Sequence, residues 1–248
     1  WFPEQQYRAM HQQGILGTTI APEFGGAGLD VLAQCFICEA LSYWNHSVAA
    51  SYLASDNLCV NNLTHNANAA QKQQYFPRFC SGEAIGALGM TEPGAGSDAL
   101  GSMATTARRD GDSFVLNGRK LFITNGPIAD VLLIYAKTAP ERSNKGISAF
   151  IVEKSFEGFG VAQKLDKMGW RGSPTGELVF DDCRVPAGNL IGEENGWPPG
   201  TSMPLGAPGG IHPAALPIPF GAPGGIHPAA PSMPLGVPGG IHPALPVP

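Results

Sequence analysis

Residues 88–98 read Leu-Gly-Met-Thr-Glu-Pro-Gly-Ala-Gly-Ser-Asp, and residues 120–126 read Lys-Leu-Phe-Ile-Thr-Asn-Gly. In both stretches a short run that favours a β-strand leads into a glycine-containing turn and carries hydroxyl side chains. Short strands separated by turns are typical of a small barrel or sandwich. These two stretches therefore set the expected fold of the sequence around them.

From Ala84 onward, short runs rich in strand-forming residues alternate with turns. The runs cover residues 85–91, 113–116, 120–124, 131–137, 148–153 and 177–180. Between two of them, Asn117-Gly118 predicts a two-residue hairpin turn, because this pair readily adopts the left-handed backbone that such turns need. We expect residues 83–196 to form a small antiparallel β-barrel or sandwich domain.

Residues 1–82 predict an all-helical domain. Residues 4–13 predict a short polar helix, and residues 15–30 a loop. Apolar residues recur at helical spacing from Val31 to about Trp44, with Asp30 as the N-cap. Residues 46–64 predict a buried helix, and residues 68–79 an amphipathic helix that ends near Ser81-Gly82. Helices followed by an all-β unit indicate the α+β class.

The composition changes abruptly after Gly196. Every Lys, Arg, Asp and Glu lies in residues 1–196, whereas residues 197–248 hold 15 of the 23 prolines and 10 of the 33 glycines. Three copies of a 15-residue repeat follow, each containing Gly-Gly-Ile-His-Pro-Ala. Proline at this density blocks helices and central strands. Residues 197–248 are therefore expected to be a disordered, low-complexity Pro/Gly tail.

Composition also argues against several classes of function. A net charge of −5 without a basic stripe argues against nucleic-acid binding, and the apolar stretches are too short to span a membrane. No signal-peptide pattern is visible, and because the chain starts at Trp1 we expect upstream residues to be missing. Five scattered cysteines favour a reducing compartment, either the bacterial cytoplasm or the mitochondrial matrix. We interpret Cys35 and Cys38 as packed free thiols, and we predict no metal site.

A flavin cofactor would account for the residue types in the two opening stretches. Its pyrimidine edge takes hydrogen bonds, its ring faces take apolar cover, and its pyrophosphate takes closely approaching backbone. Thr91, Thr124 and Ser97 would supply the hydroxyl groups, and Leu88, Met90, Phe122 and Ile123 would supply the apolar cover. Gly94 and Gly96 would let the backbone approach the ligand closely. A β-hairpin with threonines in its strands and glycines in its turns explains the same residues, so both interpretations stay open at this point.

Longer motifs resemble a known family. Residues 90–98 resemble the first signature of the acyl-CoA dehydrogenase family, and residues 116–126 resemble its second. Family-like stretches follow in the same order at residues 145–154, 165–169, 171–175 and 178–186. Upstream, Ser51-Tyr52 and residues 57–61 are similar to the isovaleryl-CoA branch. The resemblance covers residues from about 5 to 196.

The resemblance implies a helical N-terminal domain, a middle β domain and a C-terminal four-helix bundle, with FAD between the last two. It implies α,β-dehydrogenation of an acyl-CoA thioester, here a short branched one such as isovaleryl-CoA. An electron-transfer flavoprotein would be the electron acceptor and a homotetramer the assembly. Carried over by motif, the FAD contacts would be Leu88, Gly89, Met90, Thr91, Ser97, Phe122, Ile123 and Thr124. Phe122 stands where the family usually has tryptophan. The CoA contacts would be Ser97, Asn144 and Lys145.

The resemblance stops before the position of the family's catalytic glutamate. The family carries this base in the bundle, beyond the point that matches Gly196, and no carboxylate side chain follows Asn195 in this sequence. We therefore predict no catalytic residue here, and we expect a truncated sequence with a shifted reading frame after Gly196. Two alternatives to an enzyme remain: a non-catalytic FAD or acyl-CoA binding module, and a scaffold with a proline-rich interaction tail.

Overall fold

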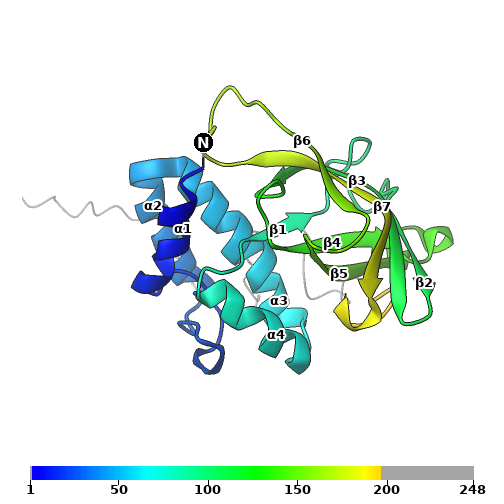
Figure 1. Ribbon diagram of the computed structural model, residues 1–248, viewed down its shortest axis with the longest axis horizontal. Helices are drawn as coiled ribbons and strands as arrows, with labels where there is room; N and C mark the ends of the chain where they lie inside the picture. Colours follow the sequence, from blue (N-terminus) through cyan, green and yellow to red (C-terminus); the bar gives the residue numbers. More distant parts are fainter. Residues whose placement is uncertain (1, 197–248) are drawn as a thin grey trace, which may run out of the picture. The chain divides into compact units, whose positions relative to one another are not determined.

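The computed structural model describes residues 2–196, and the predicted disordered tail of residues 197–248 lies outside the described residues. Helices come first in the chain and strands second, as the α+β class predicts, and Figure 1 shows the two groups packed against each other. The helical elements are α1 (Glu4–Ala9), η1 (Met10–Gln13), η2 (Pro22–Phe24), α2 (Val31–Tyr52), η3 (Leu53–Asn61), α3 (Asn62–Asn66) and α4 (Ala69–Cys80). Within residues 2–196 no helix is long and apolar enough to cross a membrane.

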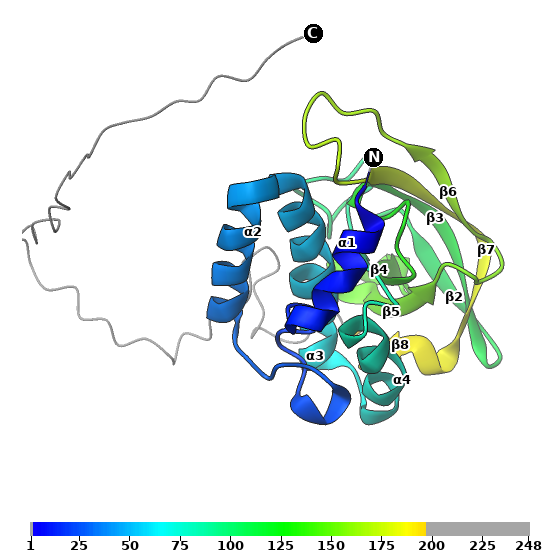
Figure 2. The same ribbon diagram turned by 60° about the vertical axis from the view of Figure 1, so that its left-hand side comes forward.

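The long helix α2 begins at the predicted N-cap, where the side chain of Asp30 accepts a hydrogen bond from the amide of Ala33 at 3.0 Å. It bends at Asn45, whose backbone is not helical (φ −157°, ψ 91°). The Asn45 side chain accepts from the amides of Ser47 and Val48, so it caps the second half of α2. The predicted division into residues 31–44 and 46–64 is confirmed by this bend, which Figure 2 shows in profile.

Helix α4 confirms the predicted amphipathic helix and connects the helical region to the end of the described chain. Asn68 and Gln71 form a reciprocal capping box at its first turn. The Gln71 side chain also donates to the carbonyls of Gly188 and Leu190, at 2.9 and 2.8 Å. One side chain therefore closes the start of α4 and fixes the chain at Gly188 and at Leu190, the first residue of strand β8 (Leu190–Ile191).

The β region is one sheet of eight strands with the order β6-β7-β3-β2-β4-β5-β8, and β1 pairs with β4. Most neighbours are antiparallel, as predicted, whereas β1 and β2 each run parallel to β4. The strands are β1 (Gly86–Gly89), β2 (Thr106–Asp110), β3 (Ser113–Thr124), β4 (Val131–Lys137), β5 (Ile147–Glu153), β6 (Phe159–Lys164), β7 (Thr175–Pro186) and β8 (Leu190–Ile191). The 3₁₀ segments η4 (Pro140–Gly146) and η5 (Ala187–Asn189) join β4 to β5 and β7 to β8.

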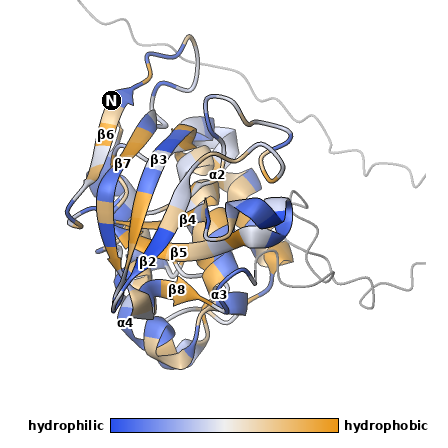
Figure 3. Cartoon of the chain, turned by 90° about the vertical axis from the view of Figure 1, so that its right-hand side faces the viewer, coloured by the Kyte–Doolittle hydropathy of each residue, from blue (hydrophilic) through white to orange (hydrophobic). Residues whose placement is uncertain are grey.

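Strands β4 and β5 are buried on both faces. Val131, Leu133 and Tyr135 pack with Tyr75, Phe76 and Phe79 of α4, whereas the alternate residues Leu132 and Ile134 pack among the other strands. This explains why both strands read as continuous apolar runs, a pattern that does not alternate because neither face meets water. The hydrophobic colour along β5 is visible in Figure 3.

The predicted hairpin turn at Asn117-Gly118 is wrong, because β3 runs through it without turning. The pairing register with β7 shifts between Leu116 and Gly118, which marks a bulge. Asn117 exchanges two hydrogen bonds with Asp182 of β7 instead of closing a turn. A Cβ at Gly118 would lie 2.5 Å from the hydroxyl oxygen of Thr105, so the glycine serves a close approach of two backbones. The hairpin lies at Gly111-Asp112, between β2 and β3.

Three strands and one thiol also differ from the sequence-based expectation. Strands β2, β6 and β8 were not predicted, since β2 is rich in charged residues, most of β6 is exposed and β8 has only two residues. All cysteines among residues 2–196 are free, as predicted, but Cys35 is exposed instead of packed. The buried position at this point of α2 is Gln34, which donates to the Asp56 carbonyl and accepts from Asn57.

Asp130, just before β4, connects the helices to the sheet. Its carboxylate accepts hydrogen bonds from Arg8 of α1 at 3.2 Å, from the Ile85 amide at 2.9 Å, and from Lys154. Burial opposes ionisation of this carboxyl group, but Lys154, the Ile85 amide and Arg8 outweigh that effect and lower the pKa of Asp130. The ionised form is thus the one that the folded chain stabilises.

We predict that Asp130→Asn lowers the free energy of unfolding at pH 6 by about 1–3 kcal/mol, because charge-assisted hydrogen bonds are replaced by weaker ones. A depressed folded-state pKa contributes stability that is present above the unfolded-state pKa of about 3.9 and is lost as the pH falls below it. The deficit of the variant should therefore shrink between pH 6 and pH 3, as measured by urea unfolding. Asp112→Asn, at the exposed hairpin turn, is the control and should leave stability nearly unchanged. A deficit that stays constant down to pH 3 would contradict the assignment.

Candidate functional site

The two stretches that carry the family signatures lie side by side in the structure. The carbonyl of Thr91, two residues after β1, accepts a hydrogen bond from the amide of Leu121 in β3 at 2.8 Å. At about 3.3 Å per strand residue, Thr124 lies within about 10 Å of that contact along β3. The segment that follows Thr91 is held at the same end of the sheet, because Lys137 at the end of β4 donates to the Gly101 carbonyl at 3.2 Å.

A buried ion pair fastens the two stretches together. The ammonium of Lys120 in β3 lies 2.8 Å from a carboxylate oxygen of Glu92, with side chains 0% and 4% exposed. Lys120 also donates to the Met90 carbonyl at 3.2 Å. Glu92 in addition accepts from the amides of Ala104 and Thr105, at 2.6 and 3.0 Å. Both ends of the segment from residue 90 to 105 are thus held by this pair.

The environment keeps both members of the pair charged near neutral pH. Burial opposes ionisation of Glu92, but Lys120 and the donors on Thr105 and Ala104 outweigh it and lower the pKa of the carboxyl group. Burial lowers the pKa of Lys120 to about 8, against the opposing effect of Glu92. A carboxylate with three donors and a low pKa is unsuited to removing a proton from a substrate. Glu92 therefore has a structural role.

Phe122 has an unusual backbone conformation and an exposed ring. Its φ is +61°, in the left-handed region that a bulky residue rarely occupies, and its side chain is 62% exposed. The β3–β7 register shifts between Lys120 and Ile123, so Phe122 sits in a bulge. Bulges redirect side chains beside functional sites, and local strain of this kind commonly marks a ligand contact.

Asn125, directly after β3, fixes the position of Thr124. It is fully buried with φ +64°, and its side-chain amide donates to the carbonyls of Ser51 in α2 and Gly86 in β1, at 2.8 and 3.1 Å. Its backbone amide donates to the Pro174 carbonyl at 2.7 Å.

The positioning roles of Asn125 and of the Glu92–Lys120 pair were not foreseen from the sequence. The only signal was that all three residues belong to the quoted motifs.

The sequence-predicted residues fall into distinct settings. Thr91 and Thr124 are half-buried, Ser97 is exposed, and Leu88 and Met90 lie half-buried against the core shared with α4. Ile123 is 3% exposed in the core between the strands, so only its backbone could reach a ligand. Gly89 lies in β1, where a Cβ would be 2.5 Å from Ile134. The structure thus brings the stretches 88–91 and 122–124 together.

Two of the three predicted CoA contacts lie on a separate connection, whereas Ser97 lies in the segment between β1 and β2. Asn144 and Lys145 are exposed on η4, which joins the end of β4 to the start of β5. Strand β1 runs parallel to β4, so the segment after Thr91 and η4 both follow strand ends at one side of the sheet. The backbone of this loop is unusual, since the neighbouring Ser143 has φ +54°.

Gly94 and Gly96 border open space. No heavy atom lies within 4 Å of the position that a Cβ would take at either residue. Packing inside the chain therefore does not explain these glycines, and the surface beside them is accessible to a ligand. Within residues 2–196, no group of His, Cys, Asp or Glu side chains is arranged to hold a metal ion.

Comparison with known proteins identifies relatives of both regions. A sequence profile for the N-terminal domain of acyl-CoA dehydrogenase matches residues 1–83, and a profile for its middle domain matches residues 87–183. The mitochondrial isovaleryl-CoA dehydrogenase of Pongo abelii is 49% identical over 191 residues, covering 76% of this chain and 45% of the relative. The chain thus spans about half the length of the curated relatives it matches.

Solved structures give the same result. The structure of butyryl-CoA dehydrogenase from Megasphaera elsdenii matches with a TM-score of 0.75 at 38% identity, covering 79% of this chain and 52% of that one. A structure of acyl-CoA dehydrogenase complexed with FAD from Bacillus anthracis matches with a TM-score of 0.72 at 36% identity. That match covers 77% of this chain and 32% of the other.

We predict that Lys120→Met lowers the free energy of unfolding by about 3–5 kcal/mol, because it leaves the Glu92 carboxylate buried without its cation. The double variant Glu92→Gln/Lys120→Met should recover part of this loss, since no uncompensated charge remains. Urea unfolding of the single and double variants measures the coupling.

Arg109→Met is the matched control for this experiment, because Arg109 pairs with Glu194 at the surface, with side chains 50% and 35% exposed. It should cost less than about 1 kcal/mol. A loss of stability in Lys120→Met no larger than in this control would rule out the buried pair as the fastening.

Proposed function

Because this chain belongs to the acyl-CoA dehydrogenase family, of which it carries the N-terminal and middle domains, we propose that it holds the flavin and the CoA thioester in FAD-dependent acyl-CoA dehydrogenation. One observation carries the proposal: the Thr91–Leu121 hydrogen bond joins the two signature stretches at one place on the sheet. The proposed domains are residues 1–82, helical, and residues 83–196, flavin- and acyl-CoA-binding. Residues 197–248 are proposed to form a separate low-complexity tail.

The residues present fit FAD. The half-buried hydroxyls of Thr91 and Thr124 suit the hydrogen-bonding edge of a flavin, and the exposed ring of Phe122 suits its apolar face. Accessible backbone at Gly94 and Gly96, with Ser97 beside them, suits a phosphate group. FAD, when bound, accepts a hydride. The role of this chain is to bind and orient the cofactor. Leu88, Gly89, Met90 and Ile123 would support the residues that contact the flavin.

The proposed substrate is an acyl-CoA thioester, with Ser97, Asn144 and Lys145 as its contacts. All three are exposed at one side of the sheet, and Lys145 adds positive charge, which suits the phosphates of CoA. A short branched acyl group is the favoured substrate, because the isovaleryl-CoA dehydrogenase of Pongo abelii is 49% identical over the matched region. Removal of the α-proton requires a carboxylate, and Glu92 is committed to Lys120. We therefore place the base outside residues 2–196.

We propose an electron-transfer flavoprotein as the electron acceptor and a homotetramer as the assembly of the whole protein. The compartment is reducing, either the mitochondrial matrix or the bacterial cytoplasm, since a relative from Pongo abelii is mitochondrial and another relative is bacterial. Free thiols at every cysteine among residues 2–196 suit such a compartment.

Flavin spectroscopy separates this proposal from its alternatives. Purified protein that is yellow and is bleached by isovaleryl-CoA supports the dehydrogenase. Yellow protein that no acyl-CoA reduces supports a non-catalytic binding module. Colourless protein whose tail binds a partner supports a scaffold. Reading the underlying nucleotide sequence in all frames tests the frameshift after Gly196, which is wrong if no frame encodes a helical bundle.

We predict that Phe122→Ala weakens FAD binding about three- to tenfold, because the flavin ring loses the aromatic cover that the Phe122 side chain provides. Titration of the full-length chain with FAD, followed by flavin fluorescence, measures the change. Phe122→Trp should bind FAD at least as tightly as the parent chain.

Tyr43→Ala removes another exposed aromatic ring, 83% exposed on α2, and serves as the control. Equal FAD affinity in Phe122→Ala and Tyr43→Ala would exclude Phe122 from the cofactor site.

A further inference from the structure

The helical region buries a carboxyl group without a cation. Asp56, in η3, is 2% exposed, and none of the ion pairs formed by residues 2–196 includes it. Its side chain accepts hydrogen bonds from the backbone amides of Gly17 and Thr18, at 2.7 and 3.4 Å. Both amides donate to the same oxygen, Oδ1, so Oδ2 can carry a proton without disturbing either bond. Burial raises the pKa of Asp56 to about 7, although the two amides oppose this effect.

The titratable groups that face Asp56 do not supply the missing positive charge. They come from the elements packed around it: Tyr7 from α1, Tyr52 from α2, Cys59 from η3 itself and Cys80 from α4. Burial, and to a smaller extent the charge of Asp56, raises the pKa of each of these groups. All of them are therefore protonated and neutral near pH 7, and the surroundings favour the uncharged form of Asp56.

The two amides that Asp56 holds belong to the 14–30 loop, which comprises residues 14–30 between η1 and α2. Inside this loop the amide of Ala27 donates to the carbonyl of Gly17 at 3.3 Å, and the amide of Gly28 donates to that of Ile20 at 2.8 Å. These bonds give the loop a shape of its own, and Asp56 attaches it to η3.

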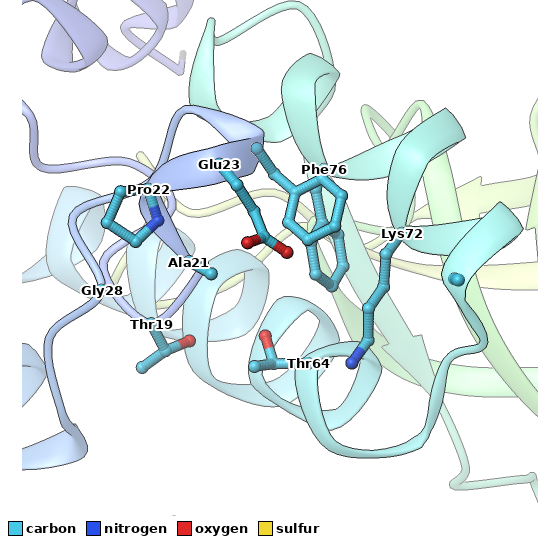
Figure 4. A pocket seen from close by; sticks show the side chains of 10 residues that line it. Thr19, Ala21, Pro22, Glu23, Gly28, Thr64, Lys72 and Phe76 are labelled. Carbon is cyan, nitrogen blue, oxygen red and sulfur yellow. The ribbon is translucent and has the colours of Figure 1, made fainter.

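Another part of the 14–30 loop lines a surface pocket. Figure 4 shows Thr19, Ala21 and Gly28 of the loop on one side of this pocket, with Thr64 of α3 and Lys72 of α4 on the other. The pocket separates this part of the loop from the two helices. The loop therefore has space beside it in which to move.

The helical segment around Asp56 is held to the sheet independently of the loop. The hydroxyl of Ser55 accepts from the amide of Gly86 in β1 at 3.0 Å, and the carbonyl of Ser51 accepts from the side chain of Asn125 at 2.8 Å. None of these partners belongs to the 14–30 loop, so the loop can detach while η3 stays in place. The π-helical geometry of η3 is rare and is frequent at functional positions.

We propose that Asp56 is a pH-dependent latch for the 14–30 loop. With a proton on its carboxyl group, Asp56 binds the amides of Gly17 and Thr18, and the loop is closed. Loss of the proton leaves a buried charge without a cation, and the loop opens so that water reaches the carboxylate. The latch belongs to the helical region and does not depend on the proposed binding of FAD or of an acyl-CoA.

The sign of the pH dependence follows from proton binding. In the open form the carboxyl group meets water and its pKa is near the ordinary value of about 3.9. In the closed form the pKa is about 7. Between these two values the closed form carries one proton more than the open form, so the opening equilibrium constant rises about tenfold per pH unit. At higher pH both forms are ionised, and the constant levels off.

Solvent exchange of the Gly17 and Thr18 amide hydrogens, followed by NMR on the full-length chain, tests the proposal. After correction for the exchange rate of an unstructured chain, their protection should fall about tenfold per pH unit between about pH 5 and 6.5 and level off above about pH 7.5. At about pH 7.5 it should be at least about tenfold lower than global unfolding, measured with urea, would allow. Protection that does not change with pH, or that equals the limit set by global unfolding, would overturn the proposal.

Two variants assign the effect to one carboxyl group. Asp56→Asn keeps an oxygen that accepts from both amides but cannot ionise, so the protection of Gly17 and Thr18 should no longer depend on pH. Glu23→Gln removes an exposed carboxylate from the same loop and should keep the slope of the parent chain. Circular dichroism checks that both variants fold, and if Asp56→Asn does not, the pH profile of the parent chain still decides. A slope that persists in folded Asp56→Asn would refute the latch.

Discussion

The buried pair of Glu92 and Lys120 is the interaction on which the proposed flavin surface depends. Each charge on its own would be costly in a dry environment, and each is held by further hydrogen bonds to the backbone, from Ala104 and Thr105 or to Met90. These bonds reach both ends of the segment between β1 and β2. A glycine-containing segment is thereby set beside β3, where Phe122 and Thr124 lie.

Neighbouring structure also holds the strained backbone at this place. Phe122 and Asn125 both have positive φ, which costs free energy and persists only where the surroundings impose it. The register shift against β7 imposes it at Phe122, and the hydrogen bonds of Asn125 to Ser51 and Gly86 impose it at Asn125. The conformation at the end of β3 is therefore fixed jointly by α2, by β1 and by the loop before β7.

The sequence was most informative where a local signal and its tertiary setting agree. Asp30 is a cap in the structure because its side chain bonds three residues ahead, and the apolar run of β4 is a strand buried on both faces. The sequence misled where a local signal served a distant contact. Asn117 forms a hydrogen bond with Asp182 across the bulge instead of closing a turn. Gly118 is a glycine because the backbone of Thr105 packs closely against it. At the site, the motifs predicted which stretches meet, but not that a buried ion pair joins them, because pairing depends on the register between strands far apart in sequence.

The burial of β4 on both faces has a consequence for how this part of the molecule opens. The strand is hydrogen-bonded to β5 along its whole length and to β1 along half of it, and helices cover it on one side. Its amide protons can meet solvent only when the helical and β regions come apart together. Deuterium uptake at Leu132 to Ala136 therefore reports the global free energy of unfolding, whereas the exposed β6 exchanges through small local openings.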